Sequence, residues 1–341
     1  MNSTFGKNLR VSVFGESHGE AVGAVIDGFP HGVRVDFVKI GEWLARRAPG
    51  GALASERMER DQPHVISGMR DGVTTGAPLC VLFANQDAHS DDYAAFSEIP
   101  RPSHADYPAR VKYDGCADLR GGGHFSGRLT LPLTFAGALC MQVLEAEGVQ
   151  IDAHLTEPTV EKIQQAKENG DSVGGIIACT VTGLPVGLGD AMFRGVEGTL
   201  AAALYAIPAV KGVEFGLGFA YADVTGSEAN DAYCVENDKV VTKTNHCGGV
   251  VGGMTTGMPV YFQVACKPTP SIARPQKTLN LATGEQTALS VTGRHDPCLA
   301  FRAVPVVACV SALALLDLWM DASPAFAAQT EKKPLRIFGK E

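Results

Sequence analysis

An apolar run from Ala303 to Met320 constrains the fold of this chain more than any other stretch. The run contains Pro305 and Asp317, so it falls short of the roughly 20 uninterrupted apolar residues that a membrane-spanning helix needs. We therefore predict a buried core helix and no membrane association. The chain has 341 residues, which is enough for a large core in one extended domain or in two smaller ones.

The other periodic segments are short and mix two kinds of pattern. Strand-like apolar runs bounded by glycine or proline cover residues 11–15, 78–84, 174–184 and 259–266. Helical periodicity covers residues 38–47, 129–148, 156–169, 197–206 and 303–320. Because strands and helices follow one another without a regular βαβ rhythm, we predict an α+β fold.

The glycines form compact clusters at 121–123, 248–249 and 252–253 and do not form a long linker. We expect one domain over residues 1–323, followed by a weakly ordered C-terminal tail over 324–341. Two long stretches, 86–103 and 222–240, are predicted to be loops that order when a ligand binds.

Net charge and cysteine usage exclude several kinds of partner. The formal net charge of -8 argues against non-specific nucleic-acid binding, which needs a basic surface, but a local cationic pocket can still bind an anionic small molecule. The nine cysteines include no C-x-x-C pair, so neither a zinc site nor a disulfide framework is indicated. Because the N-terminus also lacks the apolar region of a signal peptide, we predict a cytoplasmic protein without a metal site.

Histidine and arginine motifs near the N-terminus are the first candidates for chemistry. GESHG at 15–19 places Ser17 and His18 between glycines, in a tight loop where an imidazole can approach a ligand. The motif lacks the G-x-S-x-G frame of a serine hydrolase. Arg47 and Arg57 lie around a glycine–proline loop, and guanidinium groups suit phosphate or carboxylate ligands. Taken alone, His18 could equally be a structural histidine, and the arginines a solvated face.

Four later motifs add glycine-rich turns, hydroxyls and further charges. RPSHAD contains His104, and DLRGGGHFSGRLT at 118–130 is a glycine-rich turn that runs into a helix and presents backbone N–H groups to an anion. This turn matches neither the P-loop nor the dinucleotide fingerprint, so ATP and NAD lose support. KPTPSI at 267–272 supplies a lysine and two hydroxyls. GRHDPC contains Asp296, which could also be a simple helix N-cap.

In this order and at this spacing, the motifs resemble those of the chorismate synthase family. The resemblance runs from about Phe5 to Leu318 and rests on GESHG, RR-x-PG, GVTTGAPL, RPSHADY, RGGG, IPAVKGVEFG, NH-x-GG-x-x-GG, KPTPSI and GRHDPC. It implies a β-α-β sandwich, with helices between antiparallel sheets, that assembles as a homotetramer.

The resemblance implies a carbon–oxygen lyase of the shikimate pathway, which leads to the aromatic amino acids. Its substrate would be 5-enolpyruvylshikimate 3-phosphate, which loses phosphate by anti-1,4-elimination and becomes chorismate. In the family, bound reduced FMN lends electron density to the substrate and takes it back, so no net redox change occurs. Some members reduce their flavin with NADPH. With no obvious inserted segment, this chain is expected to receive reduced FMN from an external flavin reductase.

The resemblance also assigns roles to individual residues of this sequence. His18 would protonate the leaving phosphate, His104 would stabilise the charge of the reduced flavin, and Asp296 would be linked to removal of the ring proton. The residues implied in substrate binding are Ser17, Arg47, Arg57 and Arg128. Those implied in flavin binding are His124, Phe125, Ser126, Pro208, Ala209, Gly252, Lys267, Pro268, Thr269, Pro270, Ser271 and Arg294.

The sequence departs from the family pattern after the glycine cluster. Where the family usually reads R-S-S-A-R-E-T, residues 124–130 read H-F-S-G-R-L-T, so an arginine has become His124 and a glutamate has become Leu129. Ala308 stands where the family usually carries a glutamate. Two alternatives to an active enzyme of this kind therefore stay open. One is a drifted, non-catalytic relative that binds FMN or another anion, and the other is a phosphate lyase or mutase that needs no flavin.

Overall fold

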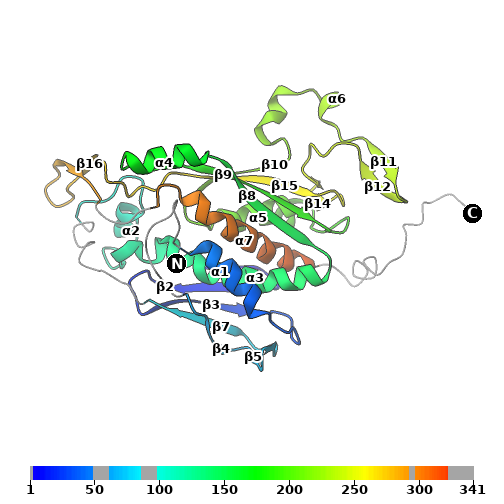
Figure 1. The fold of residues 1–341 in the computed structure, drawn as a ribbon, viewed down its shortest axis with the longest axis horizontal. Helices are drawn as coiled ribbons and strands as arrows, with labels where there is room; N and C mark the ends of the chain where they lie inside the picture. The colour runs from blue at the N-terminus through cyan, green and yellow to red at the C-terminus, as the bar shows by residue number, and fades with distance from the viewer. Residues whose placement is uncertain (1–2, 49–60, 86–97, 292–295, 322–341) are drawn as a thin grey trace, which may run out of the picture.

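A layer of helices lies between two antiparallel sheets (Figure 1). The computed structural model describes residues 3–48, 61–85, 98–291 and 296–321. The helices of this layer that bear on the site are α1 (Phe37–Arg47), α3 (Thr130–Ala146) and α7 (Leu299–Asp321). This arrangement confirms the predicted α+β sandwich.

The first sheet, at the bottom of Figure 1, has the strand order β1-β2-β3-β7-β4, with every neighbouring pair antiparallel. Its strands are β1 (Thr4–Phe5), β2 (Arg10–Gly15), β3 (Ala21–Asp27), β7 (Leu79–Ala84) and β4 (His64–Ser67). Because side chains alternate along a strand, Val22, Ala24 and Ile26 of β3 share one face, and all three are buried. This face packs on α3.

The second sheet lies on the opposite side of the helical layer and has the order β10-β15-β9-β8. Its strands are β10 (Val210–Phe215), β15 (Val260–Cys266), β9 (Gly175–Thr182) and β8 (Gln150–Glu157). Ile177, Cys179 and Val181 of the central strand β9 are fully buried and share the face that packs on α7. The helical layer is therefore enclosed by the two sheets, with α3 against the first sheet and α7 against the second.

The predicted buried helix is confirmed as α7, whose residues from Ala303 to Leu318 are all buried. Among the described residues, Leu299–Asp321 and Gly127–Ala146 are long and apolar enough to cross a membrane by length and composition. In the fold, 83% and 72% of these two windows are buried inside the protein. Their apolar surfaces are thus covered by protein and form the centre of the core.

One buried carboxylate interrupts this apolar centre and ties distant parts of the chain together. Asp317 of α7 accepts hydrogen bonds from the backbone N–H groups of Lys7, Asn8 and Leu9 at 2.7–3.0 Å. It also forms an ion pair with Arg194 at 3.1 Å. The charge is therefore compensated, as a buried carboxylate requires, and the N-terminal segment is fastened to the end of α7.

Shorter elements surround the sandwich. They are β5 (Met69–Arg70), β6 (Val73–Thr74), α2 (Asp106–Lys112), α4 (Val160–Glu168), α5 (Val196–Leu204), α6 (Gly226–Ala229), β11 (Tyr233–Glu236), β12 (Lys239–Thr242), β13 (Val250–Val251), β14 (Met254–Thr255), β16 (Gln276–Leu279) and β17 (Gln286–Leu289). Short 3-10 helices, among them η2 (Arg120–Phe125) and η3 (Gly127–Leu129), lead into α3.

Two sequence predictions are wrong. The helix expected over 156–169 starts too early, because residues 156–157 end β8, and Thr159 caps the helix α4 that follows. The loop expected over 222–240 instead forms α6 and the β11–β12 hairpin, which project from the body in Figure 1. The predicted loop residues 86–97 and the predicted tail over 324–341 lie outside the described residues.

Candidate active site

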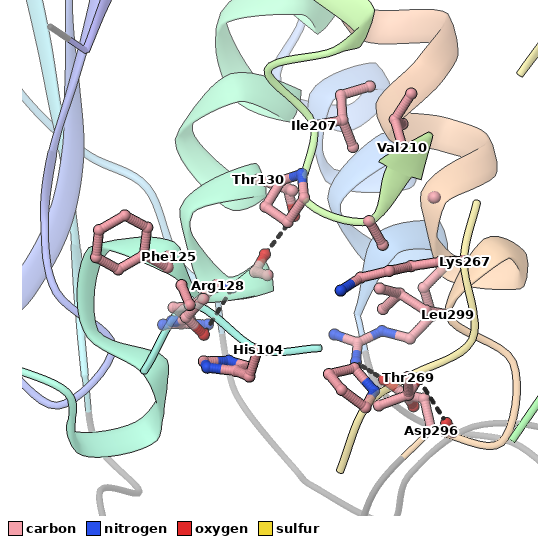
Figure 2. A pocket seen from close by; sticks show the side chains of 18 of the residues that line it. His104, Phe125, Arg128, Thr130, Ile207, Val210, Lys267, Thr269, Asp296 and Leu299 are labelled. Carbon is pink, nitrogen blue, oxygen red and sulfur yellow. Dashed lines mark hydrogen bonds and ion pairs between the residues drawn. The ribbon is translucent and has the colours of Figure 1, made fainter. Parts of the chain in front are cut away.

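A cavity of about 530 Å³ opens between the glycine-rich turn before α3 and the N-terminal end of α7 (Figure 2). This volume lies in the range of small-molecule and cofactor sites, roughly 300–1,000 Å³. Apolar side chains, including Ile207, Leu299 and Val306, stand on the same wall as charged ones. The wall is formed by parts of the segments 101–105, 121–130, 205–210, 267–271 and 296–306, together with Arg47 from the end of α1.

The glycine-rich turn holds the GESHG loop beside the cavity. Gly121, Gly122 and Gly123 have φ angles of 59°, 88° and 53°, a left-handed backbone that favours glycine. A Cβ atom on Gly121 would lie 2.3 Å from Cδ2 of His18 and 2.8 Å from Oγ of Ser17, so both side chains pack directly on this glycine. The amide of Ser17 also donates a hydrogen bond to the carbonyl of Gly123 at 3.1 Å. Since Gly121 lines the cavity, His18 and Ser17 lie directly behind its wall.

His104 is held by a buried carboxylate. Its Nδ1 lies 2.6 Å from Oδ1 of Asp106, which also accepts hydrogen bonds from the guanidinium and the backbone N–H of Arg101 at 2.8–3.0 Å. Burial alone would raise the pKa of Asp106, but the hydrogen bonds and charges of Arg101 and His104 outweigh it and hold the pKa well below its usual range. Asp106 is therefore ionised and keeps a proton on Nδ1, while Nε2 lies beside Gly122 at the cavity wall.

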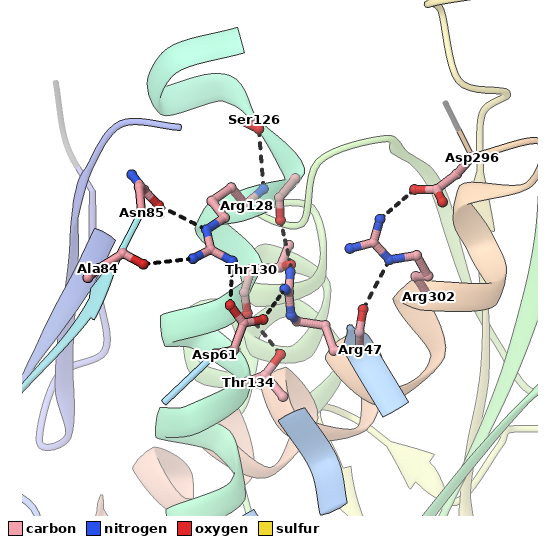
Figure 3. Close-up of polar contacts among 11 residues, drawn as sticks. Arg47, Asp61, Ala84, Asn85, Ser126, Arg128, Thr130, Thr134, Asp296 and Arg302 are labelled. Atoms are coloured by element: carbon pink, nitrogen blue, oxygen red, sulfur yellow. Dashed lines mark hydrogen bonds and ion pairs between the residues drawn. The ribbon is translucent and has the colours of Figure 1, made fainter. Parts of the chain in front are cut away.

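Three arginines and two carboxylates form a network beside the cavity (Figure 3). Asp61 bridges Arg47 and Arg128, with N–O distances of 2.8 and 2.5 Å. Arg302 binds Oδ2 of Asp296 at 2.5 Å and donates to the backbone carbonyl of Arg47 at 3.0 Å. The network therefore joins the end of α1 and the start of α7 to the turn before α3.

Arg47 is the most deeply placed cation of this network. Its side chain is 2% exposed, and its Nε is buried with no hydrogen-bond partner among the described residues. Burial is the main cause that lowers the pKa of Arg47 to about 10. Attraction by Asp61 raises this pKa, whereas repulsion from Arg302 and Arg128 lowers it further. The guanidinium is still charged at neutral pH. A buried cation with an unpaired donor on a cavity wall suits an anionic ligand.

The cavity is cationic although the whole chain is acidic. Burial, followed by repulsion from Lys211, lowers the pKa of Lys267, whose ammonium donates to the carbonyl of Ser103. Among the described residues, the cationic side chains on the wall are Arg47, Arg101, Arg128, Lys267 and Arg302. The carboxylates that pair with them are those of Asp61, Asp106 and Asp296. Two positive charges are left in excess, which suits a ligand with several anionic groups.

The sequence model of the chorismate synthase family matches residues 9–160 and 155–320 of this chain. The chain belongs to the chorismate synthase family. It is 48% identical over 325 residues to the chorismate synthase of Chitinophaga pinensis, covering 94% of this chain and 97% of that protein. It is 44% identical over 341 residues to that of Pyrococcus abyssi, covering 92% and 96%. A crystal structure of a chorismate synthase superposes with a TM-score of 0.70 at 25% identity, covering 93% of both chains.

Most residues that the family resemblance assigns to the site come together in the structure. Those on the cavity wall are Arg47, His104, His124, Phe125, Ser126, Arg128, Pro208, Ala209, Lys267, Thr269, Pro270, Ser271 and Asp296. Pro268 lies between two wall residues but not on the wall, and Gly252 lies in the turn between β13 and β14, outside this cavity. Arg57 and Arg294 lie outside the described residues.

The sequence did not single out four charged residues that organise the chorismate synthase site. They are Asp61, Arg101, Asp106 and Arg302, each of which pairs with a predicted site residue. Only Arg101 and Asp106 carried a local signal, because they enclose His104 within one motif. The N-cap alternative for Asp296 is wrong, because α7 begins three residues later, at Leu299; the carboxylate of Asp296 binds the guanidinium of Arg302.

The departures from the chorismate synthase pattern fall in two different environments. Leu129 and Ala308 lie in the hydrophobic core, 5% and 0% exposed, so apolar residues suit both positions. His124 lies on the cavity wall, but both of its ring nitrogens contact other parts of the protein. Phe125 lies against Tyr113, with ring centroids 6.4 Å apart.

Proposed function

We propose that the chain catalyses the anti-1,4-elimination of phosphate from 5-enolpyruvylshikimate 3-phosphate, which gives chorismate. This makes it a carbon–oxygen lyase acting on phosphate. The observation that carries the proposal is the cationic cavity, where the described residues leave two positive charges in excess and the buried Arg47 lies on the wall. The substrate carries one phosphate and two carboxylates, so its charge pattern matches that wall.

Reduced FMN is the proposed cofactor, and the residues on the wall fit it. The apolar side chains of Ile207, Val210 and Leu299 suit a flat ring system, while Lys267 and the glycine-rich turn suit a phosphate. When bound, reduced flavin would lend electron density to the substrate and take it back, so the overall reaction is redox-neutral. The ammonium of Lys267 supplies a charged donor for an anionic group in the cavity.

Arginine and histidine side chains promote departure of the phosphate. Arg47 and Arg128 stabilise the negative charge that grows as the C–O bond breaks, because their guanidinium groups are already fixed by Asp61. His18 donates a proton to the oxygen of the leaving phosphate. The imidazole packs on Gly121, in the same glycine-rich turn that leads into Arg128.

Asp296 accepts the ring proton. The electron pair of the broken C–H bond forms a ring double bond, the existing ring double bond shifts by one position, and the phosphate leaves with the C–O electron pair. The proton moves to a carboxylate oxygen of Asp296. Arg302 fixes this carboxylate from the first turn of α7. Asp106 fixes the His104 ring through Nδ1, which leaves Nε2 beside Gly122 at the cavity wall.

Homotetrameric assembly in the cytoplasm is part of the proposal. Its support is a set of large apolar side chains that are 85–94% exposed in the single chain, those of Met192, Phe193 and Phe219. The nine cysteines are all free, as is usual in a reducing compartment. Sedimentation velocity measures the assembly, and Phe193→Ser should shift the tetramer toward smaller species. A single-chain species for the unaltered protein would contradict it.

The direct test is an anaerobic assay that follows chorismate and phosphate together. Purified protein is mixed with 5-enolpyruvylshikimate 3-phosphate and chemically reduced FMN. Equal release of both products, absent with oxidised FMN and lost in Asp296→Asn, is the expected result. Oxidised FMN with NADPH should give product only when a separate flavin reductase is added. Tight FMN binding without product would favour the non-catalytic relative, and full activity without flavin would favour the flavin-independent lyase.

A further inference from the structure

His124, which stands where the family pattern has an arginine, uses both ring nitrogens for contacts within the protein. Nδ1 lies 2.8 Å from the carbonyl oxygen of Gly15, and Nε2 lies 2.8 Å from Oγ of Ser3. Because a carbonyl oxygen only accepts, Nδ1 carries the proton of the neutral ring, and Nε2 accepts the hydroxyl proton of Ser3. In the protonated ring, both N–H groups would be used by the same two partners.

These contacts fasten three segments that lie far apart in the sequence. Ser3 is fixed at the edge of the first sheet, since its carbonyl accepts a hydrogen bond from the amide of Val13 at 2.9 Å. Gly15 begins the GESHG loop, and the imidazole of His18 in this loop packs on Gly121. His124 itself follows directly on the glycine-rich turn. Its ring therefore connects the N-terminal segment, the GESHG loop and the wall of the cavity.

The GESHG loop is held in place by contacts with other segments, among them the side-chain amide of Asn85, which donates to the carbonyls of Glu16 and Gly19. Gly15 has a φ of 94°, where a Cβ atom would lie 2.2 Å from the carbonyl oxygen of Ala21, so only glycine fits. Glycine adds backbone freedom, and the loop has another glycine at position 19. The place of the His18 imidazole is consequently set by contacts that other segments make with the loop.

We propose that His124 and Ser3 are positioning residues that set the place of His18 at the cavity, and that His124 does not bind the ligand. The proposal rests on the proposed function in one respect, because it takes His18 as the group that protonates the leaving phosphate. A histidine that bound phosphate would need a ring N–H directed into the cavity, and here the protein uses both nitrogens.

Two amide substitutions separate the two contacts. His124→Asn keeps an N–H donor at the place of Nδ1 and loses the bond to Ser3, while His124→Gln reaches the place of Nε2 and loses the bond to Gly15. Losing one neutral hydrogen bond, worth about 1 kcal/mol, corresponds to about a fivefold effect. We expect kcat to fall about fivefold in each variant, and KM for the substrate to stay within about twofold.

Ser3→Ala tests the same contact from a residue that lies outside the cavity wall. It should lower kcat about fivefold in the unaltered protein and cause no further loss in His124→Asn, where the contact is already broken. Ser12→Ala is the matched control, since its hydroxyl lies 2.7 Å from the hydroxyl of Thr4 on the neighbouring strand and is exposed. An equal loss of kcat in Ser12→Ala would overturn the proposal, because the effect would then be general to the paired strands β1 and β2.

A second readout needs no catalytic activity. The rate at which diethyl pyrocarbonate labels His18, measured by peptide mass spectrometry, should rise about fivefold in Ser3→Ala and in both His124 variants and stay unchanged in Ser12→Ala. Unchanged labelling of His18 would overturn the proposal, and so would amide variants that raise KM while kcat is kept. If the unaltered protein forms no chorismate, the proposed function fails, but the labelling still decides the positioning role.

Discussion

Replacing Gly121 by alanine tests the contact on which the placement of His18 depends. The new Cβ atom would lie 2.3 Å from Cδ2 of the imidazole, whereas ordinary van der Waals contact begins at 3.4 Å. The ring must therefore move by about 1 Å, and a displacement of that size can lower a rate about 100-fold. The φ of 59° adds a left-handed backbone penalty of about 1–2 kcal/mol. We expect kcat to fall about 100-fold and the free energy of unfolding to fall by about 1–2 kcal/mol.

Gly115→Ala separates the two effects. Gly115 has a φ of 74°, but a Cβ atom there would meet nothing within 4 Å, and the residue lies outside the cavity. This variant should lose the same 1–2 kcal/mol in urea unfolding and keep the kcat of the anaerobic chorismate assay. If Gly121→Ala also keeps its kcat within about threefold while losing that stability, the argument that Gly121 positions His18 for catalysis is refuted.

Three further substitutions probe the charged groups of the site. The folded pKa of Asp106 is depressed, so its ionised carboxylate stabilises the fold fully above the unfolded pKa of about 3.9. This stabilisation is lost as the pH falls through the lower folded pKa. The difference in free energy of unfolding between the unaltered protein and Asp106→Asn, measured by urea unfolding, should therefore shrink below about pH 4. Arg302→Met removes the partner of the 9% exposed Asp296 carboxylate and should destabilise the fold by about 3 kcal/mol, with part regained in Arg302→Lys; an unchanged urea midpoint would contradict this. Lys267→Met should weaken FMN binding about tenfold in a fluorescence titration, and unchanged affinity would place the flavin phosphate elsewhere.

The sequence predicted those helices and strands whose apolar residues follow a regular pattern because the element is buried on one face or on all sides. The apolar run of α7 and the short runs of β7, β9 and β15 are of this kind. The prediction failed at 156–157, because pairing of β8 with β9 overrides a helical pattern that continues across Pro158. It also failed at 222–240, where the capping box of α6, between Thr225 and Glu228, is a signal that was present in the sequence.

The site was predictable as a set of residues but not as a network. The motifs carry the candidate residues in short local patterns, and packing brings most of those residues to one cavity. The partners of these residues could not be predicted, because they lie far away in the sequence. Asp61 and Arg128 are 67 positions apart, and Arg302 and Arg47 are 255 positions apart. No local pattern encodes such a pairing, because it depends on how α1, α3 and α7 pack against one another.

The central place of α7 bears on how the chain is made. The ribosome synthesises the strands of both sheets before this helix, and at about 5–20 residues per second the first strand waits roughly 15–60 s for it. Through that time the N–H groups of Lys7, Asn8 and Leu9 lack the carboxylate of Asp317 that receives them in the finished fold. The inner face of the second sheet also lacks the helix that covers it, so the nascent chain presents this apolar surface to chaperones until α7 is made.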